Sequence, residues 1–185
     1  MSKLLLPKFL FLTFVSSLSA QNFHSIQVGG GLVLPRSSSK GFSAQVQYNY
    51  SLNGTFNFYV YSGYYTWDKY NITFIDESPP YGNDKLFHSY GSDNHKLIPL
   101  YFGTRINFRT VKSFTTFIDL EVGYSYFSYT DYGHIREVDP ETGWVLSYHT
   151  DPASAKNTVK NLFGVGIGLG VFHPISESMN VVLSY

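Results

Sequence analysis

Three charged residues share the polar faces of two neighbouring predicted strands. Arg105 lies in one alternating run, and Asp119 and Glu121 lie in the next, after a short connection. Strands joined by a tight turn pair with each other, so these side chains can meet. Antiparallel strands of this kind can close into a narrow barrel, and charges inside such a barrel must pair or be hydrated. We therefore predict a polar network of Arg105, Asp119 and Glu121 that plugs a lumen; the functional alternative is a constriction that selects small ions.

A second group of residues could carry hydrolytic chemistry. His134 and His149 could join Ser147 or Glu137 as a nucleophile and its base, near the outer leaflet of a membrane. No nucleophile motif surrounds these residues, so we interpret them as scattered surface residues. We predict no catalytic residue.

Three residues of one connecting segment could offer metal ligands. They are His88, Asp93 and His95. Their spacing matches neither a zinc site nor a calcium loop. We predict no metal site and no cofactor.

Composition limits the fold classes open to the chain. It has 185 residues, enough for one domain, with 13 basic and 13 acidic residues and no cysteine. The absence of cysteine excludes a disulfide scaffold and a lipoprotein anchor. The zero formal charge argues against a nucleic-acid partner. Aromatic residues make up 18% of the chain, which favours strands.

The first twenty residues have the pattern of a secretory signal peptide. Lys3 and Lys8 precede an apolar run, and small residues follow up to Ala20. The run is shorter than the roughly 20 residues that a spanning helix needs. We therefore predict a signal at 1–20 and a single domain at 21–185. No later segment predicts a spanning helix, so a membrane location would require a closed barrel.

Strict alternation of apolar and polar residues predicts long strands. From Phe42 to Tyr50 every even position is apolar or aromatic and every odd position is polar. Most such runs exceed the ~5–6 residues usual in soluble proteins and suit a membrane strand of ~9–11 residues. We predict an all-β fold, an antiparallel up-and-down transmembrane β-barrel. The expected strands are 24–34, 42–50, 55–67, 96–108, 114–129, 159–171 and one beginning at Met179.

The expected connections alternate between short and long. Asn53 and Gly54, which tolerate positive φ, supply a tight turn. Segments 68–95 and 130–157 are long and carry five acidic residues each. Outer-membrane barrels have short periplasmic turns and long external loops, so we expect both long segments outside the cell. We predict an irregular first loop and, in the second, a hairpin of 133–138 and 144–150.

Two sets of wall residues have expected positions. Aromatic residues near the outer strand ends predict an interfacial girdle of Tyr64, Trp67, Tyr126 and Tyr129. Four glycines, Gly164, Gly166, Gly168 and Gly170, alternate on the lumen face of the run 159–171. We interpret them as space for bulky neighbours such as Phe117 or Tyr129, or as points of curvature.

The strand count leaves the predicted wall incomplete. We count six full strands and a seventh that stops at Tyr185, whereas closed bacterial barrels have an even number. We expect a truncated sequence with an eighth strand missing. The alternative takes Met179 to Tyr185 as the alternating, aromatic-ended terminal strand, with another strand unrecognised.

Three stretches resemble a known family. They are KLIPLYFGTRINF (96–108), FTTFIDLEVGYSYF (114–127) and GVGIGLGVFHPISESMNVVLSY (164–185). They resemble the outer membrane protein beta-barrel domain family, the small porin-like or OmpX-like barrels of Gram-negative bacteria. The resemblance implies a cell outer membrane location. It also implies, as partners, outer-membrane lipid and lipopolysaccharide, the barrel assembly machinery and an extracellular ligand at the acidic loops.

Three functions remain open at this point. The first is a non-enzymatic, porin-like protein with a structural and surface-binding role in adhesion or envelope integrity, and at most slight small-solute permeability. The second is an outer-membrane lipid-A-modifying enzyme, which requires a converging Ser or His site. The third is a secreted soluble barrel that binds an apolar ligand, whose outer face would be polar.

Overall fold

The computed structural model describes residues 16–19, 24–76, 85–109, 114–176 and 179–184. Nine strands account for most of them. No helix in this part of the chain is long and apolar enough to cross a membrane. The strands are β1 (Ser16–Ser19), β2 (His24–Val33), β3 (Gly41–Ser51), β4 (Phe56–Trp67), β5 (Tyr70–Asp76), β6 (Lys85–Arg109), β7 (Thr115–Val138), β8 (Val145–Ser176) and β9 (Met179–Ser184).

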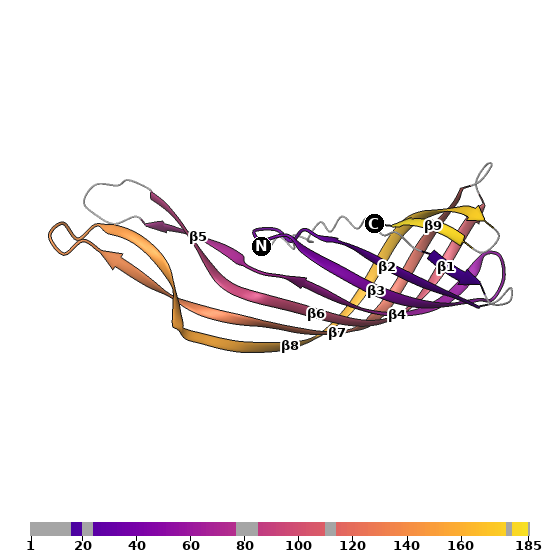
Figure 1. Cartoon of the computed structure of the whole chain (residues 1–185), viewed down its shortest axis with the longest axis horizontal. Coiled ribbons are helices and arrows are strands. Elements are labelled where there is room, and N and C mark those ends of the chain that lie inside the picture. The colour runs from indigo at the N-terminus through magenta and orange to yellow at the C-terminus, as the bar shows by residue number, and fades with distance from the viewer. Residues whose placement is uncertain (1–15, 20–23, 77–84, 110–113, 177–178, 185) are drawn as a thin grey trace.

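All nine strands belong to one antiparallel sheet. Its order is β1-β2-β3-β4-β6-β7-β8-β9, and β5 pairs with the outer part of β6. The sheet curls, and Cα atoms of β1 and β9 approach within 8 Å (Figure 1). Among the described residues, however, no hydrogen-bonded ladder joins these two strands. The predicted all-β, up-and-down arrangement is confirmed, whereas the sheet is not closed into a barrel.

The first strand lies inside the segment predicted as a signal peptide. Residues Ser16 to Ser19 pair with β2, from Ser16 opposite Val28 to Ser19 opposite Ser25. This short strand brings the path to eight strands. The rest of the predicted signal, with the cleavage position after Ala20, lies outside the described residues. The signal peptide therefore stays a prediction, whereas the expected count of seven strands is wrong by one, because β1 was not recognised.

Both long segments expected as loops are mostly strand. Residues 133–138 and 145–150 form the predicted hairpin, within β7 and β8. The expectation of an irregular first loop is wrong, because β5 pairs with β6 from Asn71 opposite Tyr90 to Asp76 opposite Lys85. Tyr70, Ile72 and Phe74 already alternate with polar residues in the sequence. The prolines that suggested irregularity, Pro79 and Pro80, lie beyond β5 and outside the described residues.

Irregular pairings divide the long strands into two parts. The register shifts after Tyr70 in β5, after Asp93 in β6 and after Asp131 in β7. Opposite the last shift, residues 152–155 bulge out of β8, and Figure 1 shows the bend there. Bulges re-aim a strand and increase its twist. We call the part with β1 to β4, β9, 96–109, 115–130 and 157–176 the wall, and the part with β5, 85–93, 131–138 and 145–156 the extension.

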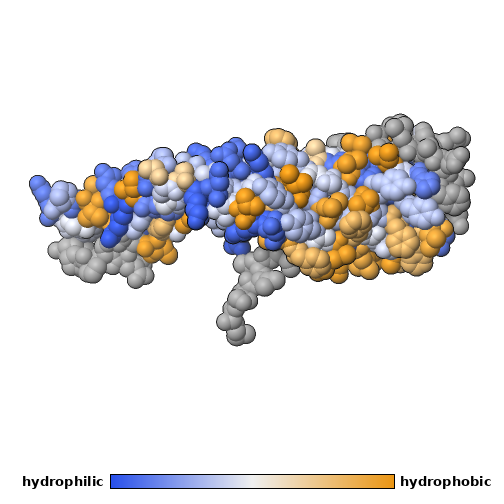
Figure 2. All heavy atoms as spheres, turned by 90° about the horizontal axis from the view of Figure 1, so that it is seen from below, coloured by the Kyte–Doolittle hydropathy of each residue, from blue (hydrophilic) through white to orange (hydrophobic). Residues whose placement is uncertain are grey.

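The wall has an apolar outer face and a polar inner face. Phe42 and Phe102 are about 59% and 58% exposed and Ile167 is 77% exposed, whereas Gln47 and Arg105 are buried. Hydrophobic residues accordingly gather over the wall in Figure 2, and the extension is mostly hydrophilic on the same side. This inverts the arrangement of a soluble protein, in which the core is apolar.

The extension consists of two hairpins that pack against each other. Among the described residues, the part of β6 from Lys85 to Gly91 pairs only with β5, and the part of β7 from Gly133 to Val138 pairs only with β8. Phe74 of the first hairpin stacks on Tyr148 of the second, with ring centroids 4.4 Å apart, and meets the edge of His134 at 4.7 Å. A hydroxyl pair, Ser89 and Thr150, lies beside them at 3.0 Å. The aromatic cluster gives the extension a small core of its own.

Side-chain oxygens close two of the turns. The Oδ1 atom of Asn53 accepts the backbone N–H groups of Thr55 and Phe56, both at 2.8 Å. Neither Asn53 nor Gly54 adopts the positive φ that we expected to form this turn. The Oδ1 atom of Asp139 accepts the N–H of Glu141 at 2.9 Å in the hairpin between β7 and β8, which we call the outer hairpin. There Gly143 does have a positive φ, 73°, which explains a glycine at that position.

Candidate functional site

A buried ion pair lies at the centre of the wall interior. Arg105 of β6 and Asp119 of β7 are direct cross-strand partners. The Nε and Nη2 atoms of Arg105 donate to the two carboxylate oxygens of Asp119, both at 2.8 Å. The guanidinium also lies 3.7 Å from the centroid of the Phe117 ring. This bidentate, stacked geometry pairs the two charges with each other on the inner face of the wall, where the strand pattern predicted that they could meet.

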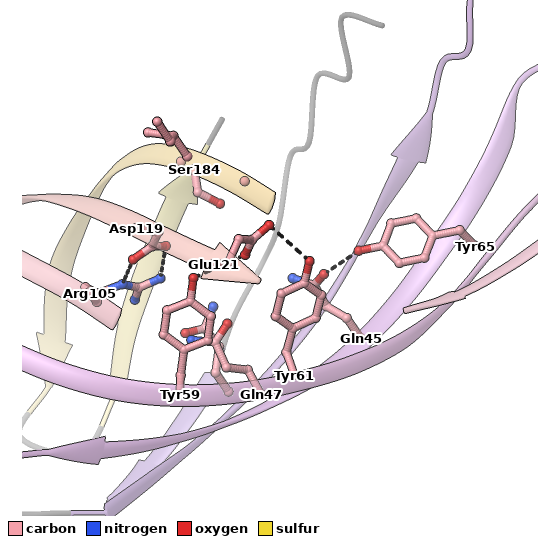
Figure 3. A pocket seen from close by; sticks show the side chains of 13 residues that line it. Gln45, Gln47, Tyr59, Tyr61, Tyr65, Arg105, Asp119, Glu121 and Ser184 are labelled. Carbon is pink, nitrogen blue, oxygen red and sulfur yellow. Dashed lines mark hydrogen bonds and ion pairs between the residues drawn. The ribbon is translucent and has the colours of Figure 1, made fainter. Parts of the chain in front are cut away.

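The third predicted member of the network is held by tyrosines. The carboxylate of Glu121 accepts hydrogen bonds from Tyr59 at 3.2 Å and from Tyr61 at 3.4 Å. Figure 3 shows both phenols rising from β4 towards Glu121, beside the Arg105 pair. The sequence therefore predicted which charges come together but missed their tyrosine partners. Their odd positions in the run 55–67 placed them on the inner face, and that was the available signal.

The interior is closely filled next to the glycines of β8. Ideal Cβ atoms built on Gly164 and Gly170 would collide with the rings of Tyr101 and Phe117. At Gly166 a Cβ would lie 2.6 Å from Oε1 of Glu121. The predicted role of these glycines as space for bulky neighbours is confirmed for Phe117. Tyr129 is not such a neighbour, because it pairs with Thr158.

A small polar cavity remains beside this network. Its volume is about 180 Å³, and Gln45, Gln47 and Tyr65 line it together with the network residues. Tyr65 donates to Oε1 of Gln45 at 2.8 Å. Amide, phenol and carboxylate groups suit water or a very small polar solute. The arrangement has no group poised for bond-making chemistry, and its side chains mainly satisfy one another.

Only two of the four residues of the predicted aromatic girdle lie on the outer face, and the girdle itself stays a prediction. Tyr64 and Tyr126 are 37% and 39% exposed on the outer face. Trp67 and Tyr129 point to the inner face instead and line a second cavity. The reason is the pleat: successive side chains of a strand point to opposite faces, and these two occupy odd positions. Nearness to a strand end alone did not decide the face.

The structure brings together three residues of the proposed hydrolytic set. Ser147 Oγ donates to Oε2 of Glu137 at 2.6 Å and lies 2.6 Å from Nε2 of His149. That same Nε2 lies 3.2 Å from Glu137. A triad needs the acid on one ring nitrogen and the nucleophile on the other. Here both partners meet one nitrogen, Glu137 and His149 are exposed and Ser147 is half-buried, and His134 packs on Phe74 instead.

The hydrogen bonds of this cluster act on the acidity of Glu137. The bond from Ser147 lowers the pKa of Glu137 most, and the bond from His149 lowers it further. A carboxylate with a lowered pKa is a weaker base at neutral pH. The cluster therefore works as a surface hydrogen-bond network.

The three potential metal ligands are used separately. His95 is buried, with Nδ1 2.7 Å from the carbonyl of Asp68 and Nε2 2.9 Å from Ser92 Oγ. His88 lies 3.2 Å from Thr73, and Asp93 accepts from Tyr132. In the part of the chain that the structure describes, no group of three acidic or histidine residues could hold a metal ion.

Comparison with known proteins adds no relative. No family model, curated protein or solved structure matches the chain. The resemblance to small outer-membrane barrels therefore rests on the three sequence stretches alone and stays a prediction.

Proposed function

We propose that the protein is a non-enzymatic, porin-like component of the cell outer membrane. In this proposal the edges of the sheet, which no hydrogen-bonded ladder joins among the described residues, pair in lipid to close the wall, and the Arg105 network plugs its interior so that few solutes pass. The extension projects outside the cell, where its acidic surface binds a ligand in adhesion or maintains envelope integrity. Lipid and lipopolysaccharide surround the wall, and the barrel assembly machinery inserts it.

The outward face of the wall carries this proposal. Outward residues of β6 between Ile98 and Phe108 include no charge, and neither do those of β7 between Ile118 and Tyr126. The charges of these spans, Arg105 among them, point inward. A strand crossing lipid needs an uncharged outer face about 25 Å tall, and roughly ten residues supply it. Water would not favour such a continuous apolar band.

Two observations weigh against the alternatives. A soluble barrel for apolar ligands would have a polar exterior, but Phe163 and Val165 are 77% and 79% exposed. A lipid-A-modifying enzyme would need a converging catalytic site, but Ser147 and Glu137 approach the same nitrogen of His149. We expect unchanged lipid A, by mass spectrometry, in cells that express Ser147→Ala.

Single cysteines test the topology, because the chain has none of its own. We choose Leu146 in the extension, Leu120 in the wall and Gly54 in a short turn; the two leucines are 55% and 46% exposed. A membrane-impermeant maleimide should label Leu146→Cys on intact cells and Leu120→Cys on neither intact nor permeabilised cells. It should label Gly54→Cys only after permeabilisation. Recovery of the protein in the soluble periplasm, or labelling of Leu120→Cys on intact cells, would overturn the proposal.

A further inference from the structure

A second cavity lies where the wall meets the extension. Its volume is about 470 Å³, within the range of small-molecule sites. Its lining comes from several elements that meet at this boundary. They are the β2–β3 connection with Arg36, β4 with Trp67, β5 with Tyr70, β6 with His95 and β7 with Tyr129. Most of the lining is apolar. The network of the wall interior contributes nothing to it, so this is a separate site.

The base of the cavity is a stack of nearly parallel rings. His95 stacks on Trp67 with centroids 5.1 Å apart and planes 6° apart, and on Tyr129 at 5.5 Å and 13°. Phe127 joins them, 6.0 Å from His95 and inclined by 19°. Aromatic rings prefer such offset stacking at 4.5–7 Å. A flat ring system can continue a stack whose members are already aligned.

The polar groups of the cavity are largely occupied by one another. His95 and Ser92 are the buried polar side chains of the lining, and they are bonded together at 2.9 Å. Tyr132 donates to Asp93. A ligand rich in hydroxyl groups would therefore lose hydrogen bonds to water without replacing them. At the edge, Arg36 and Asp131 are exposed and carry opposite charges, so neither sign of ligand charge is favoured.

We infer that this cavity binds a neutral small molecule with a flat, mainly apolar ring system. The ring would stack against the aromatic base, and any single polar group would point to the edge. The inference is independent of the proposed function, because the lining holds whether or not the wall lies in lipid.

The test uses 5-fluoroindole as the probe and ¹⁹F NMR of the purified full chain in detergent micelles. Binding to the site saturates as the probe is titrated, whereas partition into micelles does not. We expect saturable binding that unlabelled indole displaces. Tyr129→Leu should weaken it about tenfold, because it keeps an apolar side chain but removes the ring that stacks on the probe. Tyr126→Leu, three residues away on the outer face, is the matched control and should change it less than about twofold.

Tyr70→Leu keeps the test independent of folding defects in the stack. Tyr70 is 43% exposed and lies at the rim, so its loss should leave the sheet intact while weakening binding. Circular dichroism checks the fold of each variant. Absence of a saturable component in the folded wild-type chain would overturn the inference. Equal weakening by Tyr126→Leu and Tyr129→Leu would also overturn it.

Discussion

The wall and the extension are built on the same three strands but solve opposite problems. Strands β6, β7 and β8 run through both parts. In the wall they point apolar residues outward and bury charge. In the extension, Phe74 and Tyr148 pack between two hairpins while Arg136 and Glu137 are exposed. The alternation of apolar and polar side chains therefore determines which face of each part is apolar, and bulges mark the boundary between the two parts.

The two parts also treat ionic groups differently. Arg105 and Asp119 are 7% and 8% exposed and are joined by two hydrogen bonds. The side chains of His149 and Glu137 are 62% and 55% exposed. Removing one partner of a buried ion pair strongly destabilises a fold, whereas removing an exposed pair changes the stability little. We therefore expect specific polar contacts to stabilise the wall more than they stabilise the extension.

The largest predicted effect is the loss of one partner of the buried pair. Arg105→Ala leaves the carboxylate of Asp119 buried without a counter-charge, so we expect the free energy of unfolding to fall by about 3–5 kcal/mol. Urea unfolding in phospholipid vesicles measures it. The double variant Arg105→Met with Asp119→Leu removes both charges and should recover most of the loss. A loss in Arg105→Ala below about 1 kcal/mol, the range of exposed pairs, would contradict the contrast between the parts.

A charge placed on each outer surface tests the proposed lipid contact of the wall. Leu120 in the wall and Ile135 in the extension have similar exposure, 46% and 51%. Leu120→Arg should destabilise the vesicle-inserted protein by about 2–4 kcal/mol, because arginine is costly near the bilayer midplane. Ile135→Arg, in water, should change the unfolding midpoint little. Equal effects of the two substitutions would place both parts in the same solvent.

Packing at glycines gives a smaller difference between the two parts. A Cβ on Gly170 would meet the Phe117 ring and lie 2.7 Å from the backbone oxygen of Leu183, which cannot easily move. Gly170→Ala should therefore destabilise by about 1–3 kcal/mol in the same urea assay. A Cβ on Gly133, in the extension, would lie 3.1 Å from the Oγ of Ser154, a milder approach, although two hydrogen bonds hold that Oγ. Gly133→Ala should have the smaller effect, and the reverse order would refute this account of the interior.

The sequence predicted the wall better than the extension for a physical reason. Two-sided alternation gave every wall strand except β1, which lies in the segment predicted as a signal peptide, and the same parity placed Arg105, Asp119 and Glu121 on one face. It failed for Trp67 and Tyr129 only because chain position near a strand end was weighed above parity. Contacts between strands that are far apart in the sequence leave no comparable pattern in the sequence of either strand.

Contacts between the hairpins could not be found in this way. The approach of Phe74 to Tyr148 depends on the register shift after Asp93 and on the bulge of 152–155 opposite Asp131, and such irregularities have no fixed sequence signature. The aromatic cavity arises at these bulges too. The meeting of Ser147 with Glu137, by contrast, follows from the register of the predicted hairpin.

The smallest predicted effect is the pH response of the outer hairpin. The hydrogen bond from Ser147 holds the pKa of Glu137 below its ordinary value of 4.5, and His149 adds to this shift. Because the pKa is lower in the folded hairpin, the stabilisation is complete above about pH 4.5. It is lost as the pH falls through the folded pKa.

An NMR titration of the Glu137 carboxyl carbon tests both the sign and the cause. The midpoint in the wild-type protein should lie below 4.5, and Ser147→Ala should raise it towards that value. His149→Ala should raise it less, since the Ser147 bond is the larger cause. Both side chains lie in the extension, outside the wall, so neither variant should change urea unfolding of the wall measurably. A midpoint above 4.5, or a larger rise in His149→Ala, would show that the cluster is not bonded as described.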